Sequence, residues 1–263
     1  MNETPPQVIV IAGPNGAGKT TLSPFLLRDA LGVLEYVNAD PIAHGLSGFN
    51  PGSVALEAGR VMLNRLHELA EQRRTFALET TLAARHYAGW IRRLRDDGYA
   101  FQLMFLWLPS PDLAVQRVRA RVNAGGHDVP EQVIRRRYAA GLRNFSKLYQ
   151  PLANTWALYD NSESPNPIMI AQGGEGEGSS IIHVDPLGAF SRDVQMSTEI
   201  KLTKRLFIDH GKDIEKVLQR AVNHALLMHK RLGNPIATWR DGKVVIVPPE
   251  EIVIPPDVPE PNE

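Results

Sequence analysis

The eight residues GPNGAGKT at positions 13–20 decide the fold. They match the pattern G-x-x-x-x-G-K-[S/T] and stand between an apolar run, residues 8–12, and a segment with helical periodicity, residues 18–30. Glycines in such a loop let backbone N–H groups converge on phosphate oxygens, and the start of the following helix adds its positive dipole end. This strand–loop–helix context predicts a phosphate-binding P-loop rather than an ordinary glycine-rich turn.

The chemistry of P-loops assigns roles within this stretch. Lys19 is expected to reach the β- and γ-phosphates of ATP, and the Thr20 hydroxyl is expected to ligate Mg²⁺. ATP and Mg²⁺ are therefore the expected cofactors. The residues expected to bind the nucleotide are Gly13, Asn15, Gly16, Ala17, Gly18, Lys19, Thr20 and Thr21.

Composition narrows the class of protein. A chain of 263 residues, 43% of them hydrophobic, suffices for one large domain or for a domain with a small appendage. The absence of cysteine excludes a disulfide framework, a thiolate zinc site and a cysteine nucleophile. Lys plus Arg equal Asp plus Glu, at 29 each, so no net charge draws the protein to nucleic acid or to anionic lipid.

The sequence also lacks signals for a membrane or an export route. Residues 1–7 have neither the basic nor the apolar region of a signal peptide. The longest strongly apolar run, residues 103–108, is too short to span a bilayer. We therefore expect a soluble, cytoplasmic protein that binds neither nucleic acid nor membrane.

Apolar runs alternate with amphipathic segments over the first 160 residues. Such β-α alternation predicts the α/β class, with a mostly parallel sheet of five to six strands covered by helices on both faces. The expected strands are residues 8–12, 34–39, 75–78, 101–108 and 156–159, and the expected helices are residues 18–30, 53–71, 87–96, 113–123 and 131–148.

The pattern changes after Ser162. Two short apolar runs, residues 168–171 and 181–184, are expected to form an antiparallel hairpin that closes one edge of the sheet. Residues 213–232 have one continuous apolar helical face and end at Gly233. Residues 235–247 indicate a second hairpin that turns at Asp241-Gly242.

These features divide the chain into a P-loop domain, residues 1–195, and a C-terminal helix–hairpin module, residues 196–263. Its tail, beyond Ile254, is rich in proline and acid and is expected to be disordered. The apolar face of the helix must be buried, and the linker 185–201 is long enough for the module to reach back. We expect the module to dock in cis and to restrain the P-loop domain.

Acids follow two of the expected strands, and the carboxyl ends of parallel strands line a binding crevice. Asp40 is placed to accept a proton from an acceptor hydroxyl, or to ligate Mg²⁺ through water. Asn38 points the same way from the strand, so both residues are expected at the substrate. Glu79 and Thr81 are expected to bind the acceptor substrate. The alternatives are a turn or capping role for Asp40 before Pro41, and a capping role for Glu79 and Thr81 at the next helix.

The helices expected at residues 113–123 and 131–148 are strongly basic. Between residues 117 and 147 there are eight Lys or Arg residues but only two acidic residues, although the chain is neutral overall. Arginines delivered from a lid stabilise the charge on a transferring phosphoryl group. A solvated charged face is the alternative explanation.

Helical phase separates these arginines. Arg117 and Arg121 are four residues apart and share one face of the first helix, so Arg117 is assigned to the substrate. In the second helix both Arg135 and Arg137 flank the buried stripe. Arg119 and Arg136 point elsewhere and are expected in solvent.

The complete set of motifs resembles the zeta-toxin family, which are P-loop kinases that phosphorylate a sugar hydroxyl of UDP-N-acetylglucosamine. The resemblance covers roughly residues 7–172, and the loop at 125–130 is typical of the broad chromosomal branch of the family. The motifs that carry it are Gly13–Leu22, Asn38-x-Asp40, Glu79-x-Thr81-Leu82, Arg121, GGHDVP at 125–130, Arg137-Tyr138 and Tyr159–Ser162.

The resemblance implies a P-loop kinase fold and a set of roles. It implies Lys19 and Thr20 on ATP–Mg²⁺, and Asp40 as the base. It also implies that Glu79 and Thr81 bind the sugar nucleotide, and that Arg121 and Arg137 act on the transferring phosphate. No antitoxin-like three-helix segment precedes the P-loop, so we expect any inhibitor to be a separate antitoxin protein or the C-terminal module.

Other interpretations stay open. The alternatives to a sugar-nucleotide kinase are a P-loop kinase for a nucleoside or another small metabolite, and a nucleotide-gated regulatory module that binds a partner protein. A transporter ATPase is disfavoured because the run 101–108 ends in Pro109-Ser110 rather than in Asp-Glu, and because an L-S-G-G-Q signature is missing.

Overall fold

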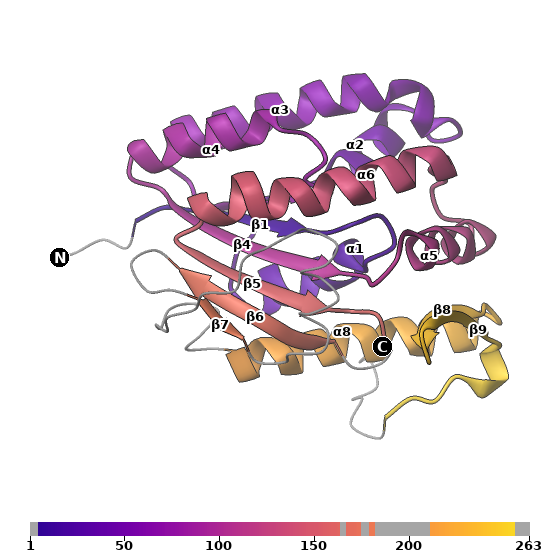
Figure 1. Cartoon of the computed structure of the whole chain (residues 1–263). Coiled ribbons are helices and arrows are strands. Elements are labelled where there is room, and N and C mark those ends of the chain that lie inside the picture. The colour runs from indigo at the N-terminus through magenta and orange to yellow at the C-terminus, as the bar shows by residue number, and fades with distance from the viewer. Residues whose placement is uncertain (1–4, 164–166, 175–178, 182–210, 256–263) are drawn as a thin grey trace.

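A computed structural model describes residues 5–163, 167–174, 179–181 and 211–255. Its centre is a seven-stranded sheet in the order β2-β3-β1-β4-β5-β6-β7 (Figure 1). The strands are β1 (Gln7–Ala12), β2 (Tyr36–Val37), β3 (Phe76–Thr80), β4 (Ala100–Trp107), β5 (Thr155–Asp160), β6 (Ile168–Gly174) and β7 (Ser179–Ile181).

The α/β class is confirmed. Strands β1 to β5 run parallel, whereas β6 pairs antiparallel with β5 and β7 pairs antiparallel with β6. The predicted edge hairpin therefore exists and brings the number of strands to seven rather than the five to six expected. Residues 182–184 of its second predicted strand lie outside the described residues.

Helices cover both faces of the sheet, with α3, α4 and α6 on one side and α1 and α8 on the other (Figure 1). Directly after α1 the chain continues as a π-helical segment, Pro24–Ala30, which we call the π segment. A second π-helical stretch, Phe145–Tyr149, continues α6. The helices are α1 (Lys19–Ser23), α2 (Ala39–Leu46), α3 (Ala55–Glu71), α4 (His86–Asp96), α5 (Pro111–Asn123), α6 (Glu131–Asn144) and α8 (Gly211–Arg231).

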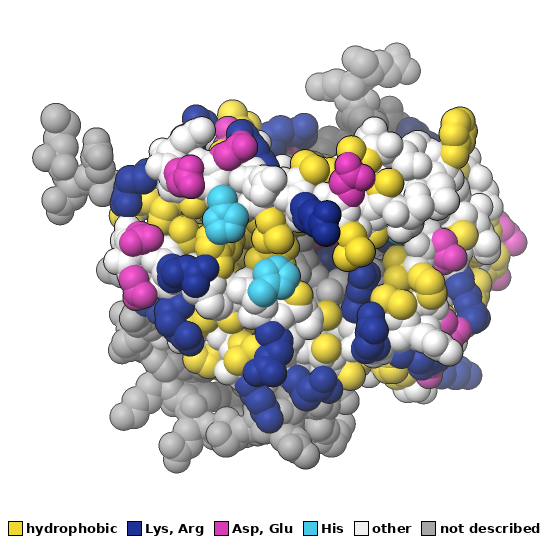
Figure 2. All heavy atoms as spheres, turned by 90° about the horizontal axis from the view of Figure 1, so that it is seen from above, with side chains coloured by type: hydrophobic (Ala, Val, Ile, Leu, Met, Phe, Trp, Pro, Cys, Tyr) yellow, Lys and Arg dark blue, Asp and Glu magenta, His cyan; other side chains and the backbone are white. Residues whose placement is uncertain are grey.

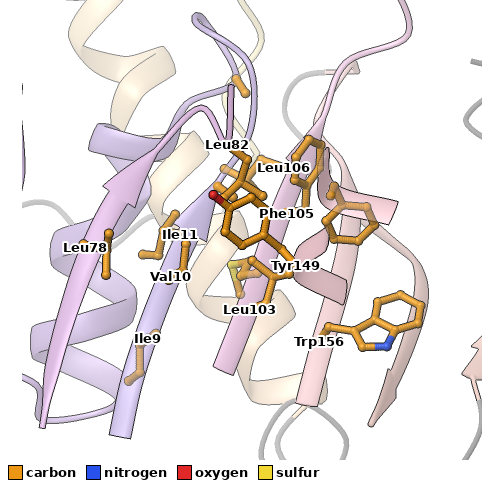
Figure 3. Close-up of a cluster of buried hydrophobic side chains, with 14 of the residues drawn as sticks. Ile9, Val10, Ile11, Leu78, Leu82, Leu103, Phe105, Leu106, Tyr149 and Trp156 are labelled. Atoms are coloured by element: carbon orange, nitrogen blue, oxygen red, sulfur yellow. The ribbon is translucent and has the colours of Figure 1, made fainter. Parts of the chain in front are cut away.

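The core lies around β1, which is central in the sheet and buried on both faces, as expected for a parallel strand. Ile9, Val10 and Ile11 are at most 1% exposed. Figure 3 shows their side chains beside those of β3 and β4, with Tyr149 among the side chains of β4. The Tyr149 hydroxyl donates to the carbonyl oxygen of Ala84 and so holds the loop that follows β3.

The second strand is shorter than predicted. β2 ends at Val37, and α2 already begins at Ala39, because Asn38 caps that helix: its side-chain oxygen accepts the backbone N–H of Asp40 at 3.0 Å. Leu34, predicted inside the strand, is 80% exposed. Pro41 falls in the first helical turn, where its missing N–H costs nothing. Asp40 therefore projects from a helix N-terminus and not from a strand.

The C-terminal helix and hairpin form as predicted, with β8 (Ile236–Arg240) and β9 (Lys243–Val247) joined at Asp241-Gly242, both with positive φ. Helix α8 packs on α1 and the π segment, and β8 packs on α5. Ile214, Leu218 and Ala221 are buried in the main core.

Docking of the module in cis is thus confirmed. The boundary proposed at residues 195/196, the linker 185–201 and the tail 256–263 lie outside the described residues. Across the described ranges, none of the helices combines the length and the apolar character needed to cross a membrane.

Candidate active site

The P-loop is held tightly at the carboxyl end of β1. Gly13, Gly16 and Gly18 have φ values of 143°, 78° and 87°, a region that side chains other than glycine rarely adopt. A Cβ at Gly13 would overlap the carbonyl oxygen of Leu106, so the loop also needs glycine for its close approach to β4. The spacing of glycines in the sequence therefore has a direct steric cause.

Lys19 stands at the centre of a cluster of charges. Its side chain is 8% exposed, and its Nζ donates to the carbonyl oxygen of Pro14 at 3.0 Å and lies 4.0 Å from Glu79 Oε1. Burial lowers the pKa of Lys19, the charges of Glu79 and Asp40 oppose that shift, and those of Arg121 and Arg137 add to it. The residues assigned to catalysis from the sequence are thus brought together.

Glu79 is the hub of a hydrogen-bond network. Its carboxylate accepts the Thr20 hydroxyl at 2.9 and 3.1 Å, the Tyr36 hydroxyl at 2.6 Å and the Asn38 amide at 3.1 Å. The Asn38 amide nitrogen also donates to the Tyr36 hydroxyl oxygen, at 3.0 Å. Burial and the charge of Glu79 raise the pKa of Tyr36, so that hydroxyl stays a donor.

This network changes two assignments. Glu79 is fixed against Thr20 of the P-loop, and Asn38 lies behind Glu79 and caps α2, so neither is free to act as a simple substrate clamp. Tyr36 was missed, although its two-residue spacing from Asn38 places both side chains on the same face of the strand.

Asp40 is exposed in the first turn of α2 and lines the same cavity as Lys19 and Glu79. Among the described residues its carboxylate has no hydrogen-bond partner, whereas its backbone N–H is held by Asn38. The charge of Asp40 acts on Arg137 and opposes the lowering of the Arg137 pKa by burial. Of the two acids, Asp40 is the one open to a ligand.

Except for Arg135, which is exposed, the arginines separate as their helical phase predicts. Arg121 lines the cavity and donates to the carbonyl oxygen of His127 at 2.6 Å, while its buried Nε has no partner within the described ranges. Arg137 is half-buried. Arg119 and Arg136 are exposed, and Arg119 pairs with Glu131 at 2.7 Å.

The rest of the basic surface is an ordinary charged one. Figure 2 shows the face seen from above, where α3, α4 and α6 lie, with Lys and Arg side chains spread across it and Asp and Glu among them. Arg135, for example, pairs with Asp112 at 2.6 Å and with Glu131 at 2.8 Å. The solvated-face explanation therefore holds for Arg135 but not for the arginines that face the cavity.

Arg117 has a structural role that was not predicted. Its Nε donates to the carbonyl oxygen of Ala237 at 3.0 Å, Nη1 to that of Asn161 at 2.7 Å and Nη2 to that of Ser162 at 2.9 Å. Burial lowers the pKa of Arg117 to about 10. Through these three bonds Arg117 joins α5 to the end of β5 and to β8. It also lines the cavity, and its assignment to the substrate stays a prediction.

Thr81 is also displaced from the expected site. Its carbonyl oxygen faces Gly141 of α6 so closely that a Cβ at Gly141 would overlap it. The next residue, Leu82, is buried with φ 54°, and its carbonyl accepts from Asn144. Thr81 does not belong to the cavity wall formed by the described residues, because the chain turns toward α6 there.

One cavity of about 230 Å³ unites these groups with the C-terminal module. The P-loop, Asp40, Glu79 and Arg121 line one part of it, and α8 and β8 line another. Asn161, at the end of β5, lies between them: its Nδ2 donates to the carbonyl oxygen of Ala17 at 2.9 Å. The crevice at the carboxyl ends of the strands is thus a real cavity, but it has a wall that the sequence did not predict.

A family model described as an AAA domain matches residues 8–148, more than half of the chain. The chain belongs to this AAA domain family. The AAA domain includes the P-loop, Asp40, Glu79 and both basic helices. Strand β5, α8 and the C-terminal hairpin lie beyond it.

Comparison with individual proteins extends this result to the fold. A Haemophilus influenzae protein without a described function is 28% identical over 132 residues, which is 50% of this chain and 92% of that protein. A structure from the PezAT chromosomal toxin–antitoxin system of Streptococcus pneumoniae has a TM-score of 0.52 and 15% identity, covering 86% of this chain and 89% of that one.

The complex of AvrRxo1-ORF1 with ORF2 and ATP has a TM-score of 0.60 and 15% identity, covering 83% of this chain and 76% of that one. At such identities the likeness concerns the fold alone. In both cases it extends well beyond the AAA domain, and it confirms the predicted architecture.

Proposed function

We propose that this protein is an ATP-dependent phosphotransferase that acts on a hydroxyl of a small molecule. The observation that carries the proposal is the meeting of Lys19, the open carboxylate of Asp40 and Arg121 around one cavity, with Arg137 near enough for its charge to act on Lys19. A nucleotide-gated module that performs no chemistry has no need of a free carboxylate beside the P-loop lysine.

The chain's own residues suffice for the transfer. Backbone N–H groups of the P-loop and Lys19 hold the β- and γ-phosphates. Asp40 accepts the proton of the acceptor hydroxyl as its oxygen forms a bond to the γ-phosphorus, and the bond from that phosphorus to the ADP oxygen breaks. Arg121 and Arg137 stabilise the negative charge on the phosphoryl group in transit.

The residues present fit Mg²⁺. Among the described residues, no group of three or more His, Cys, Asp or Glu side chains forms a metal cage. Mg²⁺, however, usually takes one or two protein oxygens and completes its shell with phosphate oxygens and water. The Thr20 hydroxyl and the Glu79 carboxylate, already in contact, would hold it, and the ion would neutralise charge on the phosphates.

The acceptor that we propose is a nucleotide sugar such as UDP-N-acetylglucosamine. The support is the set of motifs shared with the zeta-toxin family, together with a fold like that found in the PezAT toxin–antitoxin system. The same likeness supports a search for an antitoxin-like partner protein. A kinase for another small metabolite or a nucleoside is the alternative.

Mass spectrometry of a metabolite pool incubated with the protein, ATP and Mg²⁺ tests this function. We expect at least one product 80 Da heavier than its precursor, as a phosphoryl group adds about that mass when it replaces a hydroxyl proton. The Lys19→Ala variant is the control and forms no product. If the protein phosphorylated a different metabolite and not UDP-N-acetylglucosamine, the proposed kinase activity would stand but the proposed acceptor would be wrong.

Lys19→Ala is expected to remove most of the stabilisation by ATP–Mg²⁺. A ligand at about a hundred times its dissociation constant stabilises the wild type by roughly 2.7 kcal/mol, and the variant loses the contact with the β- and γ-phosphates. Thermal unfolding with and without ATP–Mg²⁺ measures the difference. An unchanged shift in the variant would contradict the assignment of the P-loop.

Alanine substitutions of the four arginines separate the transition-state role from a charged surface. Arg121→Ala and Arg137→Ala are expected to lower kcat about 10²-fold or more with little change in KM. Arg119→Ala and Arg136→Ala are the matched controls from the same two helices, and both are expected to stay near wild type. Equal, mild losses in steady-state kinetics at all four positions would contradict the model.

A further inference from the structure

We infer that helix α8 and strand β8 form the binding wall for the base of ATP, so that the C-terminal module completes the nucleotide site. The inference rests on the proposed function, because it takes ATP to be bound at the P-loop. It assigns a ligand contact to residues 211–240, which lie beyond the AAA domain.

This wall lies on the side of the P-loop toward which the nucleotide must extend. Lys19 and Thr20 contact the terminal phosphates, so the chain of the nucleotide must continue past Thr21 toward its ribose and base. Thr21 and Leu22 line the cavity, and so do Val222 and Ala225 of α8. Helix α8 packs directly on α1 and the π segment, which places it where the base end of the nucleotide has to lie.

The shape and polarity of the wall fit a flat ring. Ala221 and Ala225, four residues apart, lie on one face of α8, and Ile236 adds an apolar side chain from β8. The small alanine side chains leave the cavity open beside the helix. An aromatic base gains contact with such a wall without any polar group being left unpaired.

Four residues that line the cavity have a buried polar atom without a partner in the described part of the chain: Asn15 Oδ1, Arg121 Nε, Asn161 Oδ1 and His229 Nδ1. Two of them concern the wall: His229 lies a turn after Ala225 on α8, and Asn161 lies at the end of β5. The hydrogen bond of the Asn161 Nδ2 to the carbonyl oxygen of Ala17 fixes which way this amide points. Buried polar groups are nearly always paired, and the ring nitrogens and amino group of adenine or the ribose hydroxyls would pair them.

The wall is also rigidly attached to the site. Arg117 bridges Ala237 of β8 and the backbone of Asn161, and the Trp239 N–H donates to the carbonyl oxygen of Ser162 at 3.2 Å. A wall fixed to the end of β5 holds its distance from the P-loop, which a base-binding surface requires and a loosely tethered regulatory segment does not.

Calorimetric titration of the full chain with ATP and with inorganic tripolyphosphate, both with Mg²⁺, tests the inference. Tripolyphosphate offers the phosphate contacts without the base. Wild type is expected to bind ATP at least about tenfold more tightly than tripolyphosphate. Equal affinities for ATP and tripolyphosphate would overturn the inference but leave the proposed kinase activity standing. If Lys19→Ala weakened the binding of neither ligand, the proposed nucleotide site itself would be wrong.

A variant that fills the wall locates the contact. Ala225→Phe places a ring where the base would lie, and we expect the dissociation constant for ATP to rise about tenfold while that for tripolyphosphate changes less than about twofold. Met228→Phe, on the exposed side of the same helix, is the control and leaves both constants unchanged.

His229→Ala gives a second, milder probe, because it removes the unpaired Nδ1 without adding bulk to the cavity. It is expected to weaken ATP binding several-fold, on the order of one lost hydrogen bond, and to leave tripolyphosphate binding unaffected. If both variants weakened the binding of ATP and of tripolyphosphate by the same factor, α8 would only support the P-loop. The base-binding role would then be wrong.

Discussion

Asp40→Asn is expected to lower kcat by about 10²–10⁴-fold while the dissociation constant for ATP stays nearly unchanged. The substitution keeps the shape of the side chain but removes its capacity to take a proton. The backbone N–H of residue 40, and not its carboxylate, makes the contact with the cap Asn38, so α2 keeps its start. Steady-state kinetics and calorimetric titration with ATP measure the two quantities.

Glu79→Gln is the matched control for Asp40→Asn, because both remove one negative charge near Lys19. Glu79 holds Thr20, Tyr36 and Asn38, so its loss is expected to weaken ATP–Mg²⁺ binding as well as turnover. Near-wild-type turnover in Asp40→Asn would show that another group takes the proton. If both variants changed kcat and ATP affinity in the same way, the assignment of Asp40 as base and Glu79 as metal ligand would not hold.

Arg117→Met is expected to destabilise the protein by about 3 kcal/mol or more. The half-buried guanidinium donates to three backbone carbonyls. Its removal leaves the carbonyls of Ala237 and Asn161 without this donor, at a cost of about 1–3 kcal/mol each when they stay dry, whereas the Ser162 carbonyl keeps its bond from the Trp239 N–H. Urea unfolding measures the change in free energy. Early proteolysis in the C-terminal hairpin should accompany it, because Arg117 holds β8.

Two variants sharpen the Arg117 prediction. Arg119→Met, an exposed neighbour on the same helix, is expected to change stability by less than about 0.5 kcal/mol. Arg117→Lys is expected to be nearly as unstable as Arg117→Met, since one ammonium does not reproduce the planar fork that reaches three carbonyls. If Arg117→Met kept its stability but lost substrate affinity, the structural role would be contradicted and the assignment of Arg117 to the substrate would be supported.

The position of α8 also bears on how activity is controlled. Because Leu218 and Ala221 belong to the main core and line the nucleotide cavity, the C-terminal module is a structural part of the site. The expectation that it restrains the kinase stays a prediction. An external antitoxin also stays a prediction, and it would have to act on a site that already has a wall formed by α8 and β8.

The sequence by itself determined the P-loop, the two hairpins and the order of strands and helices, apart from α2 (Ala39–Leu46), which was not predicted. These features depend on local chemistry: glycine spacing, apolar periodicity and turn residues act within a few positions. The same local logic brought Lys19 and Arg121 to the cavity, through the glycine-rich loop and one face of a helix. It also brought Asp40 there, although this residue lies in the first turn of α2 and not at the end of a strand. It failed at β2, where the capping of α2 by Asn38 ended the strand early.

Tertiary structure alone decided which partners these side chains have. Helical phase identified the face on which Arg117 lies, but its partner Ala237 is 120 residues away. In the same way Glu79 meets Thr20 across 59 residues, and Asn161 meets Ala17 across 144. No local pattern encodes such pairs, because the packing of α8 and β8 against the parallel sheet creates them. The nucleotide cavity owes one of its walls to that packing.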